Sequence, residues 1–252
     1  YSEICRGGRA FNEYADAVLK EVNDRREEIC MNMSAPGAVN TLYIGGGTPS
    51  VLPLDVLRRI VDALLSSGSL RRGENTVGAQ SPFEEFTVEV NPEDIVEKGG
   101  EYVRGLLETG VDRVSMGIQS FDDGILRWMN RRHSAAGAVE AFRILRRCGV
   151  RNISVDLIFG LSQLADDVWK DTIERALELD PEHISAYQLS IEEGSALAKL
   201  VADGRYVEAS DEQCRHQYDV LCQTLRQAGY HHYEISNFAR PGFEAVHNSA
   251  YW

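Results

Sequence analysis

Short apolar, β-branched runs alternate with longer amphipathic segments along this chain, and that alternation limits its fold more than any other feature. Residues 41–45 predict a strand, and residues 53–65 repeat leucine and valine at helical spacing. Alternating strands and helices indicate βαβ units, and hence a parallel sheet whose ligands lie at the carboxyl ends of the strands. Further strands are expected at 86–91, 112–119, 152–159 and 183–189, with 232–235 as a candidate sixth, and helices at 9–29, 94–108, 135–148, 166–179 and 211–228.

The two faces of the predicted strands differ in polarity. Alternate residues of a strand point to opposite sides of the sheet, so the valines and isoleucines of each strand share one face. Glu89, Gln119 and Asp156 fall on the other face of three different strands. A complete eight-stranded barrel fills its interior with branched apolar side chains, so polar residues at these positions predict a ligand channel instead.

The number of strand–helix units predicts an open barrel. Five or six units are visible in 252 residues, whereas a full barrel places eight units in about 250 residues. We therefore expect an α/β fold, specifically a partial, open, TIM-like (β/α)6 barrel. Because the helix at 9–29 has no strand before it, the first strand of the barrel is expected to be missing from this chain.

Charge, hydropathy and cysteine content argue against several classes of protein. Asp and Glu number 39 against 26 Lys and Arg, and the net charge of −13 argues against a nucleic-acid-binding surface. No run of about 18 apolar residues occurs, so no membrane-spanning segment is expected. The five cysteines are odd in number and irregularly spaced, which favours free thiols in a reducing, cytoplasmic compartment.

Three glycines, Gly45 to Gly47, directly follow the first predicted strand, and Thr48-Pro49 comes next. Without a Cβ atom the backbone can touch a ligand and adopt a positive φ at little cost. A phosphate cradle fits poorly, because the spacing matches neither G-x-G-x-x-G nor the P-loop and no lysine follows. A tight turn without a ligand is the remaining alternative.

Five motifs follow one another over nearly the whole chain: LYIGGGTPS at 42–50, TVEVNPED at 87–94, VSMGIQSF at 114–121, NRRH at 130–133 and VDLIFGL at 155–161. Taken in order, they resemble the successive signatures of the radical S-adenosylmethionine (SAM) proteins of the HemN/HemW type. Each motif alone is a weak signal, but together they are highly specific.

The resemblance implies which residues surround a bound SAM molecule. A zwitterionic sulfonium ligand needs carboxylates near its cationic centres and an arginine near its carboxylate. A structural ion pair is the alternative role for the carboxylates. The residues that the resemblance assigns to SAM are Gly46, Gly47 and Thr48 in the Gly-rich turn, together with Glu89, Gln119, Arg131 and Asp156.

The resemblance also implies a [4Fe–4S] cluster, for which this sequence lacks the ligands. Proteins of this family hold the cluster with three cysteines spaced C-x3-C-x2-C after the first strand. That motif is absent here, and Cys5 alone cannot replace three thiolates. Since Tyr1-Ser2 resembles the stretch that follows the motif, we expect the cluster cysteines upstream of Tyr1. Within this chain no metal ligand and no catalytic residue is assigned.

The motif HYEISNFARPG at 232–242 resembles the HemW branch, whereas the coproporphyrinogen-oxidising branch usually has I-G-x-D-H-F-A there. The resemblance therefore implies a heme chaperone that carries SAM and a [4Fe–4S] cluster. One alternative is an enzyme, an oxygen-independent coproporphyrinogen III oxidase of porphyrin synthesis. A second alternative is a cluster-free binding module that keeps the barrel as a scaffold.

Residues 247–252 read HNSAYW, a segment that the resemblance associates with heme. An imidazole is a suitable axial ligand for heme iron, and aromatic rings pack well on a porphyrin. His247, Tyr251 and Trp252 therefore form the expected heme site. The alternative for His247 is a loop histidine that hydrogen-bonds locally.

The same resemblance places the barrel in residues 1–240 and the start of a carboxyl-terminal region in residues 241–252. The expected partners are heme or a porphyrinogen and a heme-acceptor protein, with a homodimer as one option. No nucleic-acid partner is expected.

An arginine-rich stretch belongs to none of these motifs. Seven arginines lie between residues 127 and 151, against the single acid Glu140. Arg143, Arg146 and Arg147 share a helix face by their spacing. A solvated face is the default interpretation, and an anion-binding patch for heme propionates or an acidic partner is the sharper hypothesis.

Overall fold

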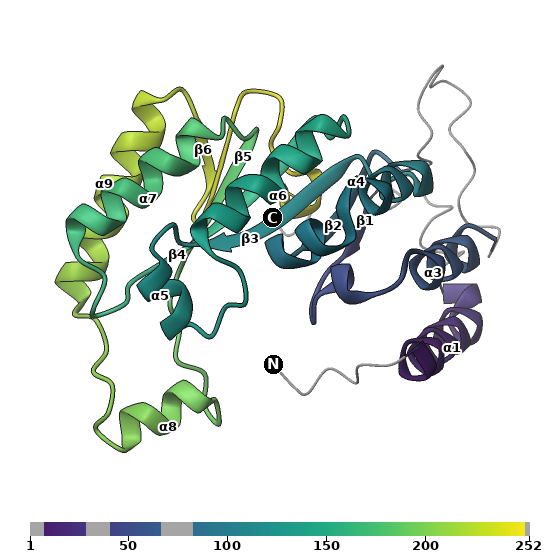
Figure 1. Cartoon of the computed structure of the whole chain (residues 1–252), viewed down its shortest axis with the longest axis horizontal. Coiled ribbons are helices and arrows are strands. Elements are labelled where there is room, and N and C mark those ends of the chain that lie inside the picture. Colours follow the sequence, from purple (N-terminus) through teal and green to yellow (C-terminus); the bar gives the residue numbers. More distant parts are fainter. Residues whose placement is uncertain (1–7, 29–40, 67–82, 250–252) are drawn as a thin grey trace. The chain divides into compact units, whose positions relative to one another are not determined.

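The computed structural model describes residues 8–28, 41–66 and 83–249, whose helices and strands are labelled in Figure 1. The chain divides into two compact units. Each unit draws on segments that lie far apart in the sequence. The first unit takes in residues 1–115, 144–151 and 245–252, and the second takes in residues 116–143 and 152–244.

The strands of the described segments are β1 (Thr41–Ile44), β2 (Glu85–Val90), β3 (Arg113–Gln119), β4 (Asn152–Phe159), β5 (His183–Gln188), β6 (His231–Glu234) and β7 (Asn237–Ala239). They hydrogen-bond in the order β1-β2-β3-β4-β5-β7-β6. β1 and β2 pair in parallel, as do β4 and β5, which agrees with the expected βαβ pattern. β7 runs antiparallel to both β5 and β6, so the sheet is mixed rather than parallel throughout.

The helices are α1 (Gly8–Asp24), the 3-10 helix η1 (Pro49–Val51), α3 (Leu54–Ser66), α4 (Pro92–Thr109), α5 (Asp123–Trp128), α6 (Ala135–Arg147), α7 (Asp166–Glu178), α8 (Ala196–Ala202), α9 (Asp211–Gln227) and α10 (Val246–Ser249). The long helices match the predicted segments. In the described part of the chain, no helix is both long and apolar enough to cross a bilayer.

The apolar core of the first unit includes side chains of α3, β2 and α4. α1 packs on α3, and α3 packs on α4. Leu57 of α3, Phe86 of β2 and Leu106 of α4 are fully or almost fully buried, and burial of each such side chain contributes about 1.5–3 kcal/mol. Along β2, Val88 is buried while Glu89 is half-buried.

The second unit is held together by contacts between helices and strand ends. α7 and α9 lie side by side (Figure 1). The indole Nε1 of buried Trp169 on α7 donates to the Gln217 carbonyl on α9 at 2.9 Å. The Gln217 side chain is itself buried, accepting from the Gly160 N–H and donating to the Leu164 carbonyl, both at 2.9 Å. A buried amide satisfied at both ends fixes α9 relative to the end of β4.

Ser134 and Ser210 cap the helices that the sequence predicts at 135–148 and 211–228. Ser134 Oγ accepts the Gly137 N–H at 3.1 Å, and Ser210 Oγ accepts the Gln213 N–H at 3.2 Å. The Gln213 side chain does not complete a reciprocal capping box. Its amide instead donates to the carbonyls of Leu161 and Leu164 at 3.2 Å each, which ties α9 to the loop after β4.

The described cysteines bear out the expected free thiols. Cys148, Cys214 and Cys222 form no disulfide. Cys5 and Cys30 lie outside the described residues.

Candidate functional site

Glu89 on β2 is bound by the Gly-rich turn that follows β1. Its Oε2 atom accepts the Gly46 N–H at 2.9 Å, and its Oε1 atom accepts the Tyr43 hydroxyl at 2.6 Å. The parallel register places Tyr43 opposite Thr87, which brings the turn to the carboxyl end of β2. A carboxylate has about four acceptor sites, so two donors leave capacity for a ligand ammonium.

Glycine is required at this turn for two separate reasons. A Cβ at Gly45 would lie 2.5 Å from Tyr43 Cε1 and 2.8 Å from Glu89 Oε1, so a side chain there would displace both residues. Gly46 has φ of 103°, in the left-handed region that favours glycine. Nothing lies within 4 Å of a Cβ placed at Gly46 or Gly47, so the backbone of the turn is open to a ligand.

The end of the turn is tied to the start of α4. Asn91 Nδ2 donates to Thr48 Oγ1 at 3.0 Å, and the Asn91 N–H donates to Ser50 Oγ at 3.0 Å. Ser50 Oγ in turn donates to the buried carboxylate of Asp94 at 2.6 Å. No role was predicted for Ser50, Asn91 and Asp94. The available signal was the cluster of helix-capping residue types beside Pro92.

Gln119, at the end of β3 in the second unit, has a strained backbone. Its φ is 69°, which is uncommon for a residue with a side chain, and the Ser120 N–H donates to the Ile118 carbonyl at 2.9 Å. This i to i+2 hydrogen bond with positive φ is a γ-turn, and such a conformation costs about 1–3 kcal/mol. Strain of this kind concentrates at functional positions, which supports the predicted role of Gln119.

Arg131 follows α5 and belongs to a segment that is tied to the same strand end. The Arg131 N–H donates to the Leu126 carbonyl at 2.9 Å. Two residues later, the buried His133 donates through Nε2 to the Ile118 carbonyl at 3.0 Å. The segment that carries Arg131 is therefore tied through His133 to the carboxyl end of β3, next to Gln119.

Asp156 lies on β4, opposite Ser185 of β5. The same face of these strands carries Ser154 and His183, whose Oγ and Nδ1 atoms are hydrogen-bonded at 2.7 Å. His183 Nε2 is hydrogen-bonded to the Tyr233 hydroxyl on β6, also at 2.7 Å. This polar face agrees with the predicted ligand channel, although no role was predicted for His183 and Tyr233. Their spacing in the sequence gave no sign that they meet.

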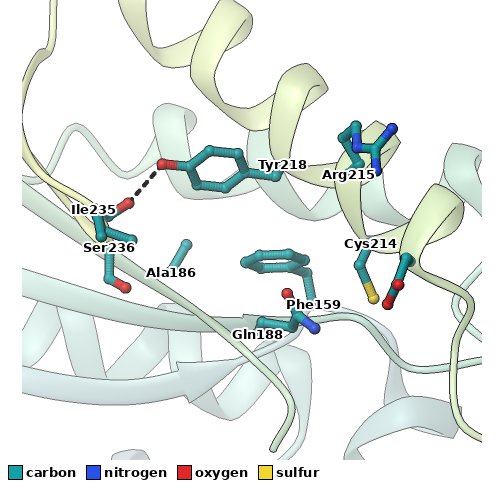
Figure 2. A pocket seen from close by; sticks show the side chains of 9 residues that line it. Phe159, Ala186, Gln188, Cys214, Arg215, Tyr218, Ile235 and Ser236 are labelled. Atoms are coloured by element: carbon teal, nitrogen blue, oxygen red, sulfur yellow. Dashed lines mark hydrogen bonds between the residues drawn. The ribbon is translucent and has the colours of Figure 1, made fainter.

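A cleft of about 500 Å³ opens beside α9 in the second unit (Figure 2). Phe159, Ala186 and Tyr218 line it, and the Tyr218 hydroxyl donates to the Ile235 carbonyl at 2.9 Å. Because side chains alternate along a strand, Phe159 of β4 points away from the face that carries Asp156. The cleft is therefore distinct from the polar face that holds the predicted SAM residue.

His247 lies in the first unit, on the short helix α10. Its ring stacks on the Tyr43 ring, with centroids 4.6 Å apart and planes inclined by 19°. The buried carboxylate of Glu85 accepts the N–H groups of Val246 at 3.0 Å and His247 at 3.1 Å, which docks the segment on β2. Tyr251 and Trp252 lie outside the described residues.

The described residues suit the amino acid end of SAM but not an iron–sulfur cluster. The half-buried Glu89 carboxylate beside an open, side-chain-free backbone at Gly46 and Gly47 is a suitable receptor for an ammonium group. No group of three His, Cys, Asp or Glu side chains able to hold a metal ion occurs in the described segments. Burial raises the pKa of the Cys214 and Cys222 thiols, which keeps them protonated and poor ligands.

Comparisons with known proteins identify the family of this chain. The model of the radical SAM superfamily matches residues 11–176. The heme chaperone HemW of Bacillus subtilis is 33% identical over 247 residues, which cover 96% of this chain and 62% of that protein. HemW of Lactococcus lactis is 30% identical over 252 residues, covering 100% of this chain and 61% of that protein.

A solved structure is also similar. Coproporphyrinogen III oxidase (HemN) from Escherichia coli, a radical SAM enzyme, aligns with a TM-score of 0.73 at 25% identity, over 95% of this chain and 51% of that chain. This likeness confirms the predicted α/β fold class. The chain spans less than two thirds of the length of each of these relatives.

The predicted SAM residues fall into two sets. Gly46, Gly47, Thr48 and Glu89 come together in the first unit, and Gln119, Arg131 and Asp156 lie in the second.

Proposed function

Because this chain belongs to the radical SAM superfamily, we propose that its Gly-rich turn and Glu89 hold the methionyl end of SAM. A radical SAM domain implies this cofactor together with an iron–sulfur cluster. Glu89 supplies the negative charge for the ammonium group, and Arg131 supplies the positive charge for the carboxylate. Gln119 and Asp156 complete the set of polar contacts. When bound, SAM supplies radical chemistry.

The function that this site supports best is that of a heme chaperone, which binds heme and transfers it to acceptor proteins. The observation that carries it is the docked position of His247. Its backbone is fixed by Glu85 and its ring by Tyr43, so an imidazole is held ready as an axial ligand. The likeness to HemW proteins over nearly the whole chain supports the same function.

Heme titration of the full-length protein, reconstituted anaerobically with its cluster, tests this function. We expect a Soret band on heme binding and loss of that band from the protein when an apo-acceptor is added. His247→Ala should weaken heme binding by at least about tenfold, equivalent to about 1.4 kcal/mol. His216→Ala, which removes an exposed imidazole on α9, is the matched control. Equal heme affinity in both variants would contradict the assignment of His247.

The likeness to HemN favours a second candidate, the oxygen-independent coproporphyrinogen III oxidase. Turnover of coproporphyrinogen III by the same reconstituted protein would establish this activity and overturn the preference for a chaperone. Heme binding without turnover supports the chaperone.

The expected cluster separates both candidates from a cluster-free binding module. The described cysteines do not supply the cluster, so its ligands are proposed to lie upstream of Tyr1. Determination of the upstream sequence tests this directly. A C-x3-C-x2-C motif there supports a radical SAM protein, and its absence from the complete protein supports the module.

The setting of the protein follows from the same proposal. Residues 241–252 form the start of a carboxyl-terminal region, and the irregular, free cysteines favour a reducing, cytoplasmic compartment. The partner is an apo-protein that accepts heme. A homodimer is compatible with this role.

A further inference from the structure

Three contacts of the first unit converge on Tyr43 of β1. Its hydroxyl donates to Glu89 Oε1 at 2.6 Å, which joins it to the proposed SAM site. Its ring stacks on His247 at a centroid distance of 4.6 Å, which joins it to the proposed heme ligand. Its Cε1 atom occupies the space that a side chain at position 45 would need, so Gly45 permits this placement.

The residues on both sides of Tyr43 are anchored independently of it. Glu89 also accepts the Gly46 N–H at 2.9 Å, and the His247 N–H donates to Glu85 Oε1 at 3.1 Å. Glu85 and Glu89 are four residues apart on β2, so their side chains share one face of the strand, roughly 13 Å apart. The register of β1 puts Tyr43 opposite Thr87, midway between them. Tyr43 therefore completes a continuous set of contacts from the Gly-rich turn to His247.

We propose that Tyr43 is a shared positioning residue, which orients Glu89 for the SAM ammonium through its hydroxyl and His247 for heme iron through its ring. The proposal rests on the proposed function. The two contacts use the hydroxyl and the ring respectively, so the hydroxyl contact can be removed while the ring contact stays. An outer partner that fixes the orientation of a metal-binding imidazole commonly changes affinity by about 10–100-fold, and an oriented carboxylate binds with less loss of side-chain entropy.

Because one side chain serves both ligands, their binding is linked. A ligand that holds either Glu89 or His247 also orders Tyr43, and the second ligand then meets a side chain that is already ordered. Ordering one such side chain costs about 0.5–1.5 kcal/mol, which corresponds to a linkage of roughly 2- to 13-fold. Linkage is reciprocal, so SAM tightens heme binding by the same factor by which heme tightens SAM binding.

Two substitutions in the full-length, cluster-containing protein separate these roles. Tyr43→Phe keeps the stacked ring and removes the hydroxyl. We expect it to weaken SAM binding about 3- to 10-fold in equilibrium dialysis, to leave heme affinity within about twofold by Soret titration, and to abolish the linkage. Tyr43→Leu removes both contacts, so both affinities should fall. A residue that only supported the fold would not separate SAM from heme affinity in this way.

Tyr14→Phe is the matched control, because it removes a phenol hydroxyl from a side chain that is 55% exposed on α1. It should leave both affinities and the linkage unchanged. Unchanged SAM affinity in Tyr43→Phe, or unchanged heme affinity in Tyr43→Leu, would overturn the proposal. If the wild-type protein binds SAM but no heme, the chaperone function fails, and the dialysis arm still decides whether Tyr43 orients Glu89.

Discussion

The side chain of Asp112 lies where burial disfavours its charged form. It follows α4, its Oδ1 atom accepts the Phe86 N–H at 2.8 Å, and its own N–H donates to the Phe86 carbonyl at 3.1 Å. Burial raises the pKa of its carboxyl group to about 6, and the neighbouring carboxylate of Glu85 adds to the increase. The folded protein therefore holds a proton at Asp112 more tightly than the unfolded chain does.

This raised pKa predicts a pH dependence of stability. Between about pH 4 and pH 6 the folded state binds more protons than the unfolded state, so the free energy of unfolding falls as pH rises. Above about pH 6 the full loss of stability has occurred. Asp112→Asn keeps an acceptor for Phe86 without the charge. We expect it to gain about 1 kcal/mol at pH 7.5, a value reduced because the side chain is partly exposed, and to gain nothing near pH 4. Urea denaturation at both pH values measures this, and an equal gain at both would exclude the carboxyl group as the cause.

The backbone conformation of Gln119 predicts that a glycine at this position makes the protein more stable than an alanine does. At ordinary helix and strand positions Ala is more stable than Gly, but at φ of 69° the order should reverse. Gln119→Gly should therefore unfold with a free energy about 1 kcal/mol higher than Gln119→Ala. Both variants lose the side-chain amide, so the difference between their free energies of unfolding reports the backbone strain. Thermal or urea unfolding measures it, and Ala at least as stable as Gly would contradict the strain.

Strand parity predicted the polar face of Glu89 and Asp156, because side-chain alternation depends only on position along a strand. It could not predict the conformation of Gln119. Glutamine has no special preference for positive φ, so nothing in the residue type indicates a γ-turn. Nor did it indicate that Tyr43 meets His247, which lies 204 positions later in the chain and reaches β1 through the docking of Glu85.

At the scale of elements, the contact of α3 with α4 depends on a glycine, Gly105, at the point where the helices meet. A Cβ at Gly105 would lie 2.0 Å from Leu54 Cδ2 and 3.1 Å from Leu54 Cγ. Gly105→Ala should therefore cost about 1–3 kcal/mol by overpacking, despite the better helix propensity of alanine. Gly137→Ala on α6, where a Cβ meets only Ser134 Oγ at 3.4 Å, should instead gain about 0.5–1 kcal/mol. Urea denaturation of both variants should therefore show changes in the free energy of unfolding of opposite sign. Changes of the same sign would refute the prediction.

The longer elements were predictable because apolar periodicity persists over many residues. The four-residue repeat of α9 and the alternation of β4 each extend over several periods. β7 has three residues and α10 has four, which is too short for any period to appear. The start of α4 was predicted at Asp94 and lies at Pro92, where Asn91 as N-cap and a proline at the first turn supplied a usable signal.

At the scale of the whole molecule, the arginine-rich stretch is the exception to a net charge of −13. Arg143 and Arg147 are exposed on α6, while Arg146 Nη1 donates to the Val150 carbonyl at 3.1 Å. If the stretch is an anion-binding patch, the triple reversal of Arg143, Arg146 and Arg147 to Glu should weaken heme or acceptor binding at low salt. The reversal of Arg143 and Arg147 alone spares the Val150 contact and controls for misfolding. Unchanged affinity at low salt would leave the patch as a solvated face.

Glu85 contacts the segment that carries His247 through main-chain N–H groups, so these hydrogen bonds do not depend on the side chains at 246 and 247. A substitution at 247 therefore removes the stack on Tyr43 but keeps the two hydrogen bonds to Glu85. If heme binds as proposed, a methionine or cysteine at 247 would offer a different donor atom to the heme iron from the same backbone position. A fluorescent residue placed there would then report the binding of heme.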